Sequence, residues 1–182
     1  LKPDPRAWAI VIGCRAEENG RESGASLTAA NDARLIRQTL AMDYRVATSH
    51  LLDGSDVPRR MLEHAIAALF KRMAAQQAGD SGDSQFILYY AGPAYLGSNA
   101  LPYLAPDVYG VTGNETIDLS LQSLLAQMEK SPARDKMLLF DVQQRVAGAG
   151  SADILEALKE RRGPVSESVS VTGSSGRDTA AN

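Results

Sequence analysis

The sequence predicts an α/β domain with a mostly parallel sheet that is covered by helices on both faces. Three apolar-rich runs, at residues 8–13, 85–91 and 136–142, have the composition of strands that are buried on both sides. Segments with apolar residues at helical spacing lie between them. Strands that alternate with helices form parallel sheets through right-handed crossovers, and ligands of such sheets bind beyond the carboxyl ends of the strands.

The first predicted helix follows the strand at residues 8–13 and a polar loop. Ser26 is placed to cap its amino end, because a serine hydroxyl accepts hydrogen bonds from the backbone N–H groups of a first turn. The inner face of this helix consists of apolar residues at helical spacing: Ala29, Ala33, Ile36 and Leu40. A second strand is predicted at residues 46–52.

The second predicted helix spans residues 57–78, and a Gly/Asp/Ser turn separates it from the strand at residues 85–91. Its predicted apolar stripe consists of Met61, Ala65, Leu69 and Met73. A short hairpin element is predicted at residues 101–104.

Two further helices are predicted in the second half of the chain. One spans residues 119–128 and has Leu121, Leu124, Leu125 and Met128 on one side. After the strand at residues 136–142, Ser151 is placed to cap a fourth helix that runs to Arg161. A fifth strand is predicted at residues 165–172.

Length and composition indicate one globular domain, residues 1–172, followed by a flexible Gly/Ser-rich tail at residues 173–182. The chain has 182 residues, of which 44% are hydrophobic and 23% are charged. A net charge of −3 provides no broad field that would attract nucleic acid, so nucleic acid is not expected as a partner. No apolar run approaches the roughly 18 residues of a membrane span.

The chain has few residues with reactive side chains: one cysteine, Cys14, and two histidines, His50 and His64. These counts exclude a disulfide within the chain and a Cys/His zinc cluster. The loop after Gly13 lacks the glycine spacing of a phosphate-binding loop. We therefore predict no cofactor and no metal.

Five segments occur in an order that is shared with one family of peptidases. They are residues 9–13 (AIVIG), 27–33 (LTAANDA), 86–92 (FILYYAG), 101–107 (LPYLAPD) and 138–141 (LLFD). In this order they resemble the caspase-like cysteine peptidases, especially the metacaspase and bacterial caspase-like branch. The resemblance covers most of the chain and implies a caspase-like three-layer sandwich. That family has a six-stranded sheet, so either the sequence is a fragment or the sheet ends in an exposed edge that invites dimerisation.

The residues at the two catalytic positions of that family are replaced in this chain. The resemblance places the catalytic histidine at Pro93 and the catalytic cysteine at Gln143, which keeps the family's spacing of roughly 50 residues. Proline has no titratable group, and a glutamine amide is neither a nucleophile nor a base near neutral pH. The resemblance therefore implies that peptide hydrolysis has been lost.

The remaining thiol and imidazoles are not expected to rebuild a catalytic pair. Cys14 follows the first strand and is expected to be an inert side chain. His50 is expected to be a solvated residue at a strand end, and His64 to lie on the polar face of a helix. A serine nucleophile at Ser98 or Ser151 would lack its base.

Two acids remain where the resemblance implies a pocket for Arg or Lys. The positions that line this pocket in metacaspases correspond to Asp32 and Asp141. Two carboxylates that converge on a cleft can hold a guanidinium through charge-assisted hydrogen bonds. Alternatively, Asp32 caps a helix or bonds locally and Asp141 satisfies loop amides. A third interpretation is that Arg15 or Arg145 fills the pocket.

The predicted function is that of a pseudoprotease, a caspase-like domain that binds a peptide or protein carrying Arg or Lys without cutting it. The alternatives are a structural module that positions neighbouring domains and a doubly wound α/β enzyme of another class. Asp80, Asp83 and Asp107 are oxygen donors near predicted loops, but they lack the spacing of an EF-hand, and solvated turns are the preferred interpretation.

Overall fold

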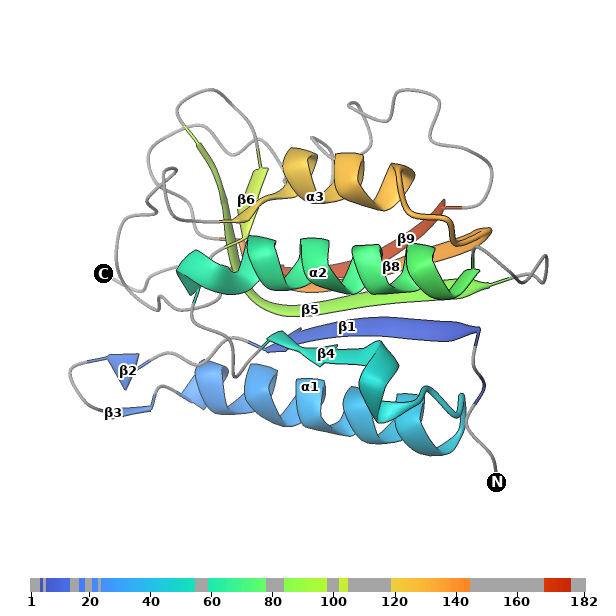
Figure 1. Ribbon diagram of the computed structural model, residues 1–182. Coiled ribbons are helices and arrows are strands. Elements are labelled where there is room, and N and C mark those ends of the chain that lie inside the picture. The colour runs from blue at the N-terminus through green and yellow to red at the C-terminus, as the bar shows by residue number, and fades with distance from the viewer. Residues whose placement is uncertain are drawn as a thin grey trace, which may run out of the picture.

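The fold was analysed in a computed structural model of the 182-residue chain (Figure 1). The structure describes residues 4, 6–13, 17–18, 21–22, 24–54, 59–77, 84–97, 102–104, 119–144 and 169–177. The predicted helix at residues 151–161 therefore lies outside the described residues, as do Cys14, Arg15, Ser98 and Arg145.

A row of parallel strands forms the centre of the domain. β1 (Ala7–Gly13) pairs with β4 (Leu51–Asp53) on one side and with β5 (Gln85–Leu96) on the other. β8 (Asp135–Gln144) pairs with β5, and β9 (Val169–Arg177) pairs with β8. All these pairs are parallel, which gives the order β4-β1-β5-β8-β9. The predicted mostly parallel sheet is confirmed.

Short antiparallel strands extend this sheet near the carboxyl end of β5. β6 (Pro102–Leu104) pairs with the last residues of β5, and β7 (Leu119–Ser120) pairs with β6. The hairpin element predicted at residues 101–104 is therefore confirmed. A separate two-stranded ribbon consists of β2 (Glu17–Glu18) and β3 (Arg21–Glu22).

Helices cover both faces of the sheet, as the sequence predicts (Figure 1). α1 (Gly24–Met42) packs on one face, which is called the α1 face below. α2 (Arg59–Gln77) and α3 (Leu121–Glu129) pack on the opposite face. Because successive strand residues point to opposite sides, β1 contributes to both hydrophobic cores, and all seven of its residues are buried.

Local contacts define both ends of α3. The hydroxyl of Ser120 accepts a hydrogen bond from the backbone N–H of Ser123, which satisfies a donor of the first turn. At the other end, Lys136 Nζ donates to the carbonyl oxygen of Glu129 at 3.1 Å. Burial lowers the pKa of Lys136, while the Glu129 carboxylate opposes this shift.

β5 changes its neighbouring strand at Gly92 and Pro93. Ala91 is the last residue of β5 that pairs with β1, and Ala94 is the first that pairs with β6. Gly92 has a φ of 154°, a backbone conformation that residues with a Cβ rarely adopt. A glycine at this position therefore allows the strand to leave one partner and join another.

Three features of the first half of the chain differ from the sequence prediction. α1 begins at Gly24, so Ser26 lies inside its first turn and is not the N-cap. In α2 the fully buried stripe is Leu62, Ile66, Leu69 and Met73, whereas the predicted Met61 is 54% exposed. The predicted strand at residues 46–52 is reduced to β4, because a 3₁₀ turn at Thr48–His50 precedes it.

His50 is buried rather than solvated. Its side chain is only 5% exposed, and its ring stacks on the indole of Trp8, with centroids 3.8 Å apart and planes 7° from parallel. Its predicted place at a strand end indicated a solvated side chain. In the structure His50 ends a 3₁₀ turn before β4, and its imidazole packs on Trp8 of β1. His64 lies on the exposed side of α2, as predicted.

The last strand extends into the segment predicted to be a tail. β9 (Val169–Arg177) continues through Gly173–Gly176, and residues 165–168 of the predicted strand lie outside the described residues. Glycine and serine have little intrinsic preference for strands, but backbone pairing with β8 overrides this preference. The predicted boundary after residue 172 therefore does not hold.

None of the described helices combines the length and the apolar character that a membrane span requires.

Candidate functional site

The carboxyl ends of β5 and β8 bring together Pro93 and Gln143, the positions that the family resemblance assigns to a catalytic pair. Pro93 and Gln143 are direct partners in the parallel register of these strands. Neighbouring strands lie about 4.8 Å apart, so the two backbones are adjacent although the residues are far apart in sequence. The edge of the sheet where ligands of α/β folds bind thus carries a proline beside a glutamine.

Asp141 lies on the α1 face of β8, two residues before Gln143. Strand alternation places it on the same face as Leu139, whereas Phe140 and Val142 belong to the core on the other face. Asp141 is exposed and is paired in register with Ala91. The carboxylate is therefore presented on the α1 side of the sheet.

Asp32 approaches the same region from α1. It lies well inside the helix Gly24–Met42 and is half-buried. On one side it is next to the part of the helix where Ala29 and Ala33 pack on the sheet, and its other side faces solvent. The interpretation of Asp32 as a helix cap is therefore wrong, because Asp32 lies in the interior of α1 and not at its amino end.

Tyr89 links the two acids, and sequence analysis did not identify it. Burial raises the pKa of its phenol to about 12, and the negative charges of Asp141 and then Asp32 add to this effect. Both carboxylates therefore act electrostatically on one phenol. The alternation of β5 could have indicated this residue, since Tyr89 and Tyr90 must point to opposite faces.

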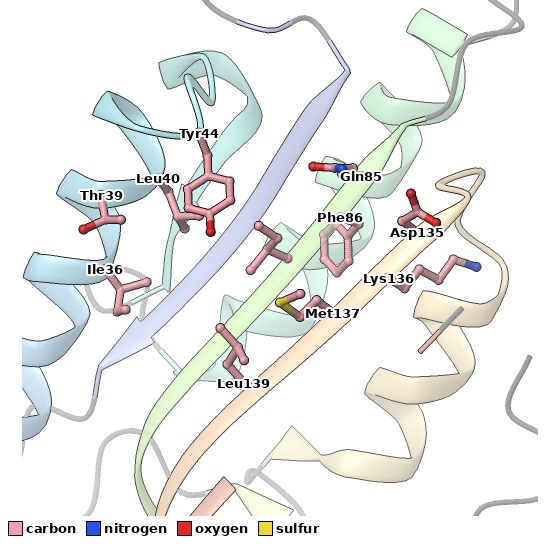
Figure 2. Close-up of a pocket in the computed structure, with 11 residues that line it drawn as sticks. Ile36, Thr39, Leu40, Tyr44, Gln85, Phe86, Asp135, Lys136, Met137 and Leu139 are labelled. Carbon is pink, nitrogen blue, oxygen red and sulfur yellow. The ribbon is translucent and has the colours of Figure 1, made fainter. Parts of the chain in front are cut away.

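A cleft of about 370 Å³ lies on the α1 face next to this group. α1 forms one wall, through Ile36, Leu40 and Tyr44, and β5 and β8 form the floor (Figure 2). Most of its lining is apolar, and Asp135 and Gln85 lie at the amino end of the strands. Its volume is within the usual range of ligand pockets. Sequence analysis could not predict this cleft, because it depends on where α1 lies across the sheet.

The described residues contain no group of three or more His, Cys, Asp and Glu side chains that could hold a metal ion. Asp80, Asp83 and Asp107 lie outside the part of the chain that the structure describes. His50 stacks on Trp8 on the α2 and α3 face, away from the acids.

The phenol of Tyr89 is expected to ionise at a higher pH than that of an ordinary tyrosine, and an alkaline titration measures this pH. In the difference spectrum between the wild type and Tyr89→Phe, the phenolate signal should appear with a pKa of about 12. Because the folded pKa lies above the ordinary value of 10.0, the stability due to the buried neutral phenol is complete below pH 10. It is lost as the pH rises towards 12. Asp141→Asn should lower the pKa of Tyr89, whereas an unchanged pKa would exclude a contribution from this carboxylate.

Comparisons with known proteins leave the family of this chain open. A search of protein-family models found no match, and a search of curated proteins found no significant relative.

Proposed function

We propose that this chain is a degenerate member of the caspase-like peptidases that binds a peptide or protein and does not cut it. The observation that carries this proposal is the pairing of Pro93 with Gln143 at the carboxyl edge of the sheet. A sheet with helices on both faces and the order β4-β1-β5-β8-β9 is compatible with a caspase-like sandwich. The five segments that resemble the family place its catalytic pair at these two residues.

The chemistry of the two side chains supports the loss of hydrolysis. A cysteine peptidase needs a thiolate and a neighbouring imidazole, because a thiol with an unperturbed pKa is mostly protonated at neutral pH. Proline supplies no base, and the glutamine amide supplies no nucleophile. This part of the edge can contact a peptide but cannot form an acyl-enzyme.

The group formed by Asp32, Tyr89 and Asp141 is the proposed binding pocket. Its two carboxylates favour a cation, and a guanidinium can donate several hydrogen bonds to them at once. The phenol of Tyr89 is neutral at physiological pH, so it can donate or accept a hydrogen bond but contributes no charge of its own. The ligand that fits best is a peptide with an exposed Arg or Lys.

The pocket is tested by the binding of a short arginyl peptide. Asp32→Ala and Asp141→Ala should each weaken binding about threefold, because the lost charge-assisted contacts are partly screened by solvent. Isothermal titration at low and high salt measures the effect, and Asp43→Ala, at an exposed position after the end of α1, is the matched control. Equal affinity in all four proteins would exclude the pocket.

The loss of catalysis is tested with fluorogenic Arg and Lys peptides, with and without calcium, because active metacaspases commonly need that ion. No turnover is expected from the wild type. Turnover that persists through purification and is abolished by Cys14→Ala would overturn the pseudoprotease proposal.

The strand order also supports a second candidate, a doubly wound enzyme of another class. The order β4-β1-β5-β8-β9 is that of flavodoxin-like sheets, which bind a cofactor where the strand order reverses. In this chain that point lies between the carboxyl ends of β1 and β5. A nucleotide or flavin that co-purifies with the protein, detected by its absorbance, would favour this candidate. The missing glycine motif after Gly13 counts against it.

A further inference from the structure

The apolar cleft continues directly from the acidic pocket. On the α1 face of β8, Asp141 is followed towards the amino end by Leu139, Met137 and Asp135. On α1, Ile36 lies one helical turn after Asp32 and faces the same cleft. The acids thus lie at one end of an apolar groove between α1 and β8. Figure 2 shows the residues that line this groove.

The floor of this groove is unusually exposed for an interior strand. β8 has neighbours on both sides, and such strands of parallel sheets are normally covered on both faces. On its other face Leu138, Phe140 and Val142 are at most 3% exposed, whereas Met137 on the α1 face is 42% exposed. Within the described part of the chain, α1 is the only helix on this face.

The far wall of the groove shows the same pattern. Tyr44, just after the end of α1, is 55% exposed and also lines the groove. Its ring lies on the side of α1 that faces the strands (Figure 2). Among the described residues, exposed apolar side chains therefore lie on both the floor and the wall of the groove, as on surfaces that a partner covers.

Length and charge specify the partner. The stretch of β8 from Asp135 to Asp141 is about 20 Å long at 3.3 Å per residue. A helix covers this length in about 13 residues, and a helix is the element that packs beside another helix on a parallel sheet. Its amino end carries a positive partial charge, so that end and a basic side chain in its first turn would both complement Asp32 and Asp141.

We propose that an amphipathic helix of a partner protein docks in this groove beside α1. An Arg or Lys in its first turn binds Asp32 and Asp141, and its apolar stripe packs on Ile36, Leu139 and Met137. This inference rests on the proposed function, because it uses the same acidic pocket. It adds the conformation of the partner and the apolar contacts that select it.

The probe is a labelled synthetic helix of about 14 residues with Arg in its first turn and leucines at helical spacing. Fluorescence anisotropy should show tighter binding of this probe than of the short arginyl peptide. Met137→Lys should weaken binding of the probe about tenfold or more, because the leucines would then bury a charge. Met61→Lys, at a methionine 54% exposed on the opposite face, should leave it unchanged.

Two further measurements separate the helix from the pocket. A probe with proline at its centre, which cannot form the full helix, should bind no better than the short arginyl peptide. Tyr44→Glu should also weaken binding of the intact probe. Circular dichroism should show that the Tyr44→Glu and Met137→Lys variants both remain folded. The double variant Asp32→Asn with Asp141→Asn should lower the affinity for the probe about threefold to tenfold.

The outcomes distinguish the two proposals. If the short peptide binds through the acids but the helix binds no better, the docking inference is overturned and the proposed function stands. If Met137→Lys and Met61→Lys bind the probe equally, the groove is not its site and the inference is overturned. If neither the probe nor the short peptide binds, both proposals fail.

Discussion

Replacement of Pro93 by histidine and Gln143 by cysteine is expected to give a thiol that reacts with iodoacetamide about threefold faster at pH 7 than in Gln143→Cys alone. The two positions are register partners on β5 and β8, so an imidazole and a thiol on these strands can form a pair. The reaction is followed by mass spectrometry in a Cys14→Ala background. Because Cys14 is the only cysteine of the chain, the introduced thiol is then the only one present.

The expected magnitude follows from the thiolate fraction. A thiol with a pKa of about 8.5 is only a few per cent ionised at pH 7, whereas an imidazolium partner can make the thiolate the main species. At a pKa of about 6.5 the thiolate fraction rises about twenty-fivefold, and the lower nucleophilicity of a less basic thiolate, about eightfold, reduces the gain in rate to about threefold. Pro93→Asn with Gln143→Cys is the control, since asparagine removes the proline without adding a base. Equal rates for histidine and asparagine would contradict the proposed equivalence of these positions with a catalytic pair.

The second large effect is expected at Gly13, where β1 meets α1. Gly13→Ala should lower the free energy of unfolding by about 2 kcal/mol or more. A Cβ at this position would lie 2.6 Å from the Cβ of Ala33 and 2.9 Å from the carbonyl oxygen of Ala29. These atoms belong to the helix backbone or are fixed to it, so α1 itself must move. Urea unfolding of the wild type and the variant, with comparison of their m-values, measures the change.

Gly54 provides the comparison for this prediction. A Cβ at Gly54 would also come within 2.6 Å of another atom, but its two nearest contacts are side-chain atoms, Cγ1 of Ile12 and Cδ1 of Leu62, which can adjust without moving the backbone. Gly54→Ala should therefore cost less than Gly13→Ala. Adding Ala33→Gly to Gly13→Ala should recover at least about 1 kcal/mol beyond additivity, because it removes the closest contact. A strictly additive pair would show that this contact does not determine the loss.

Movement of α1 should also affect binding. Asp32 and Ile36 lie on this helix, so a displacement of α1 changes their distance from β8. Gly13→Ala should thus weaken binding of the arginyl peptide in addition to lowering the free energy of unfolding.

The strands of the sheet could be predicted because their signal is local. The apolar run that ends at Gly13 and the run Phe86–Tyr90 are buried on both faces, and their shortness and their β-branched and aromatic residues favour a strand over a buried helix. The helix stripe of α2 was less certain, since alanines and methionines at residues 61–74 fit two adjacent stripes. Packing on the sheet selects the stripe that contains Leu62 and Ile66.

The candidate site was predictable only in part. The family resemblance predicts that Asp32 and Asp141 share one pocket, and the charges of both carboxylates raise the pKa of Tyr89. Tyr89 and the groove were missed because they depend on which face α1 covers, and the sequence carries no local signal for that choice. The burial of His50 was also missed, because its stacking partner Trp8 lies in a strand that is far from it in the sequence.

The burial of β1 has a consequence for the time during which the chain is being made. All seven of its residues are buried in the folded protein, yet its partners lie far along the sequence, with Ala9 opposite Leu51 and Ala7 opposite Gln85. A ribosome therefore releases this apolar segment well before β5 exists to pair with it. Until then the segment is a target for chaperones and for aggregation with other nascent chains, and non-local pairing of this kind also makes folding slow.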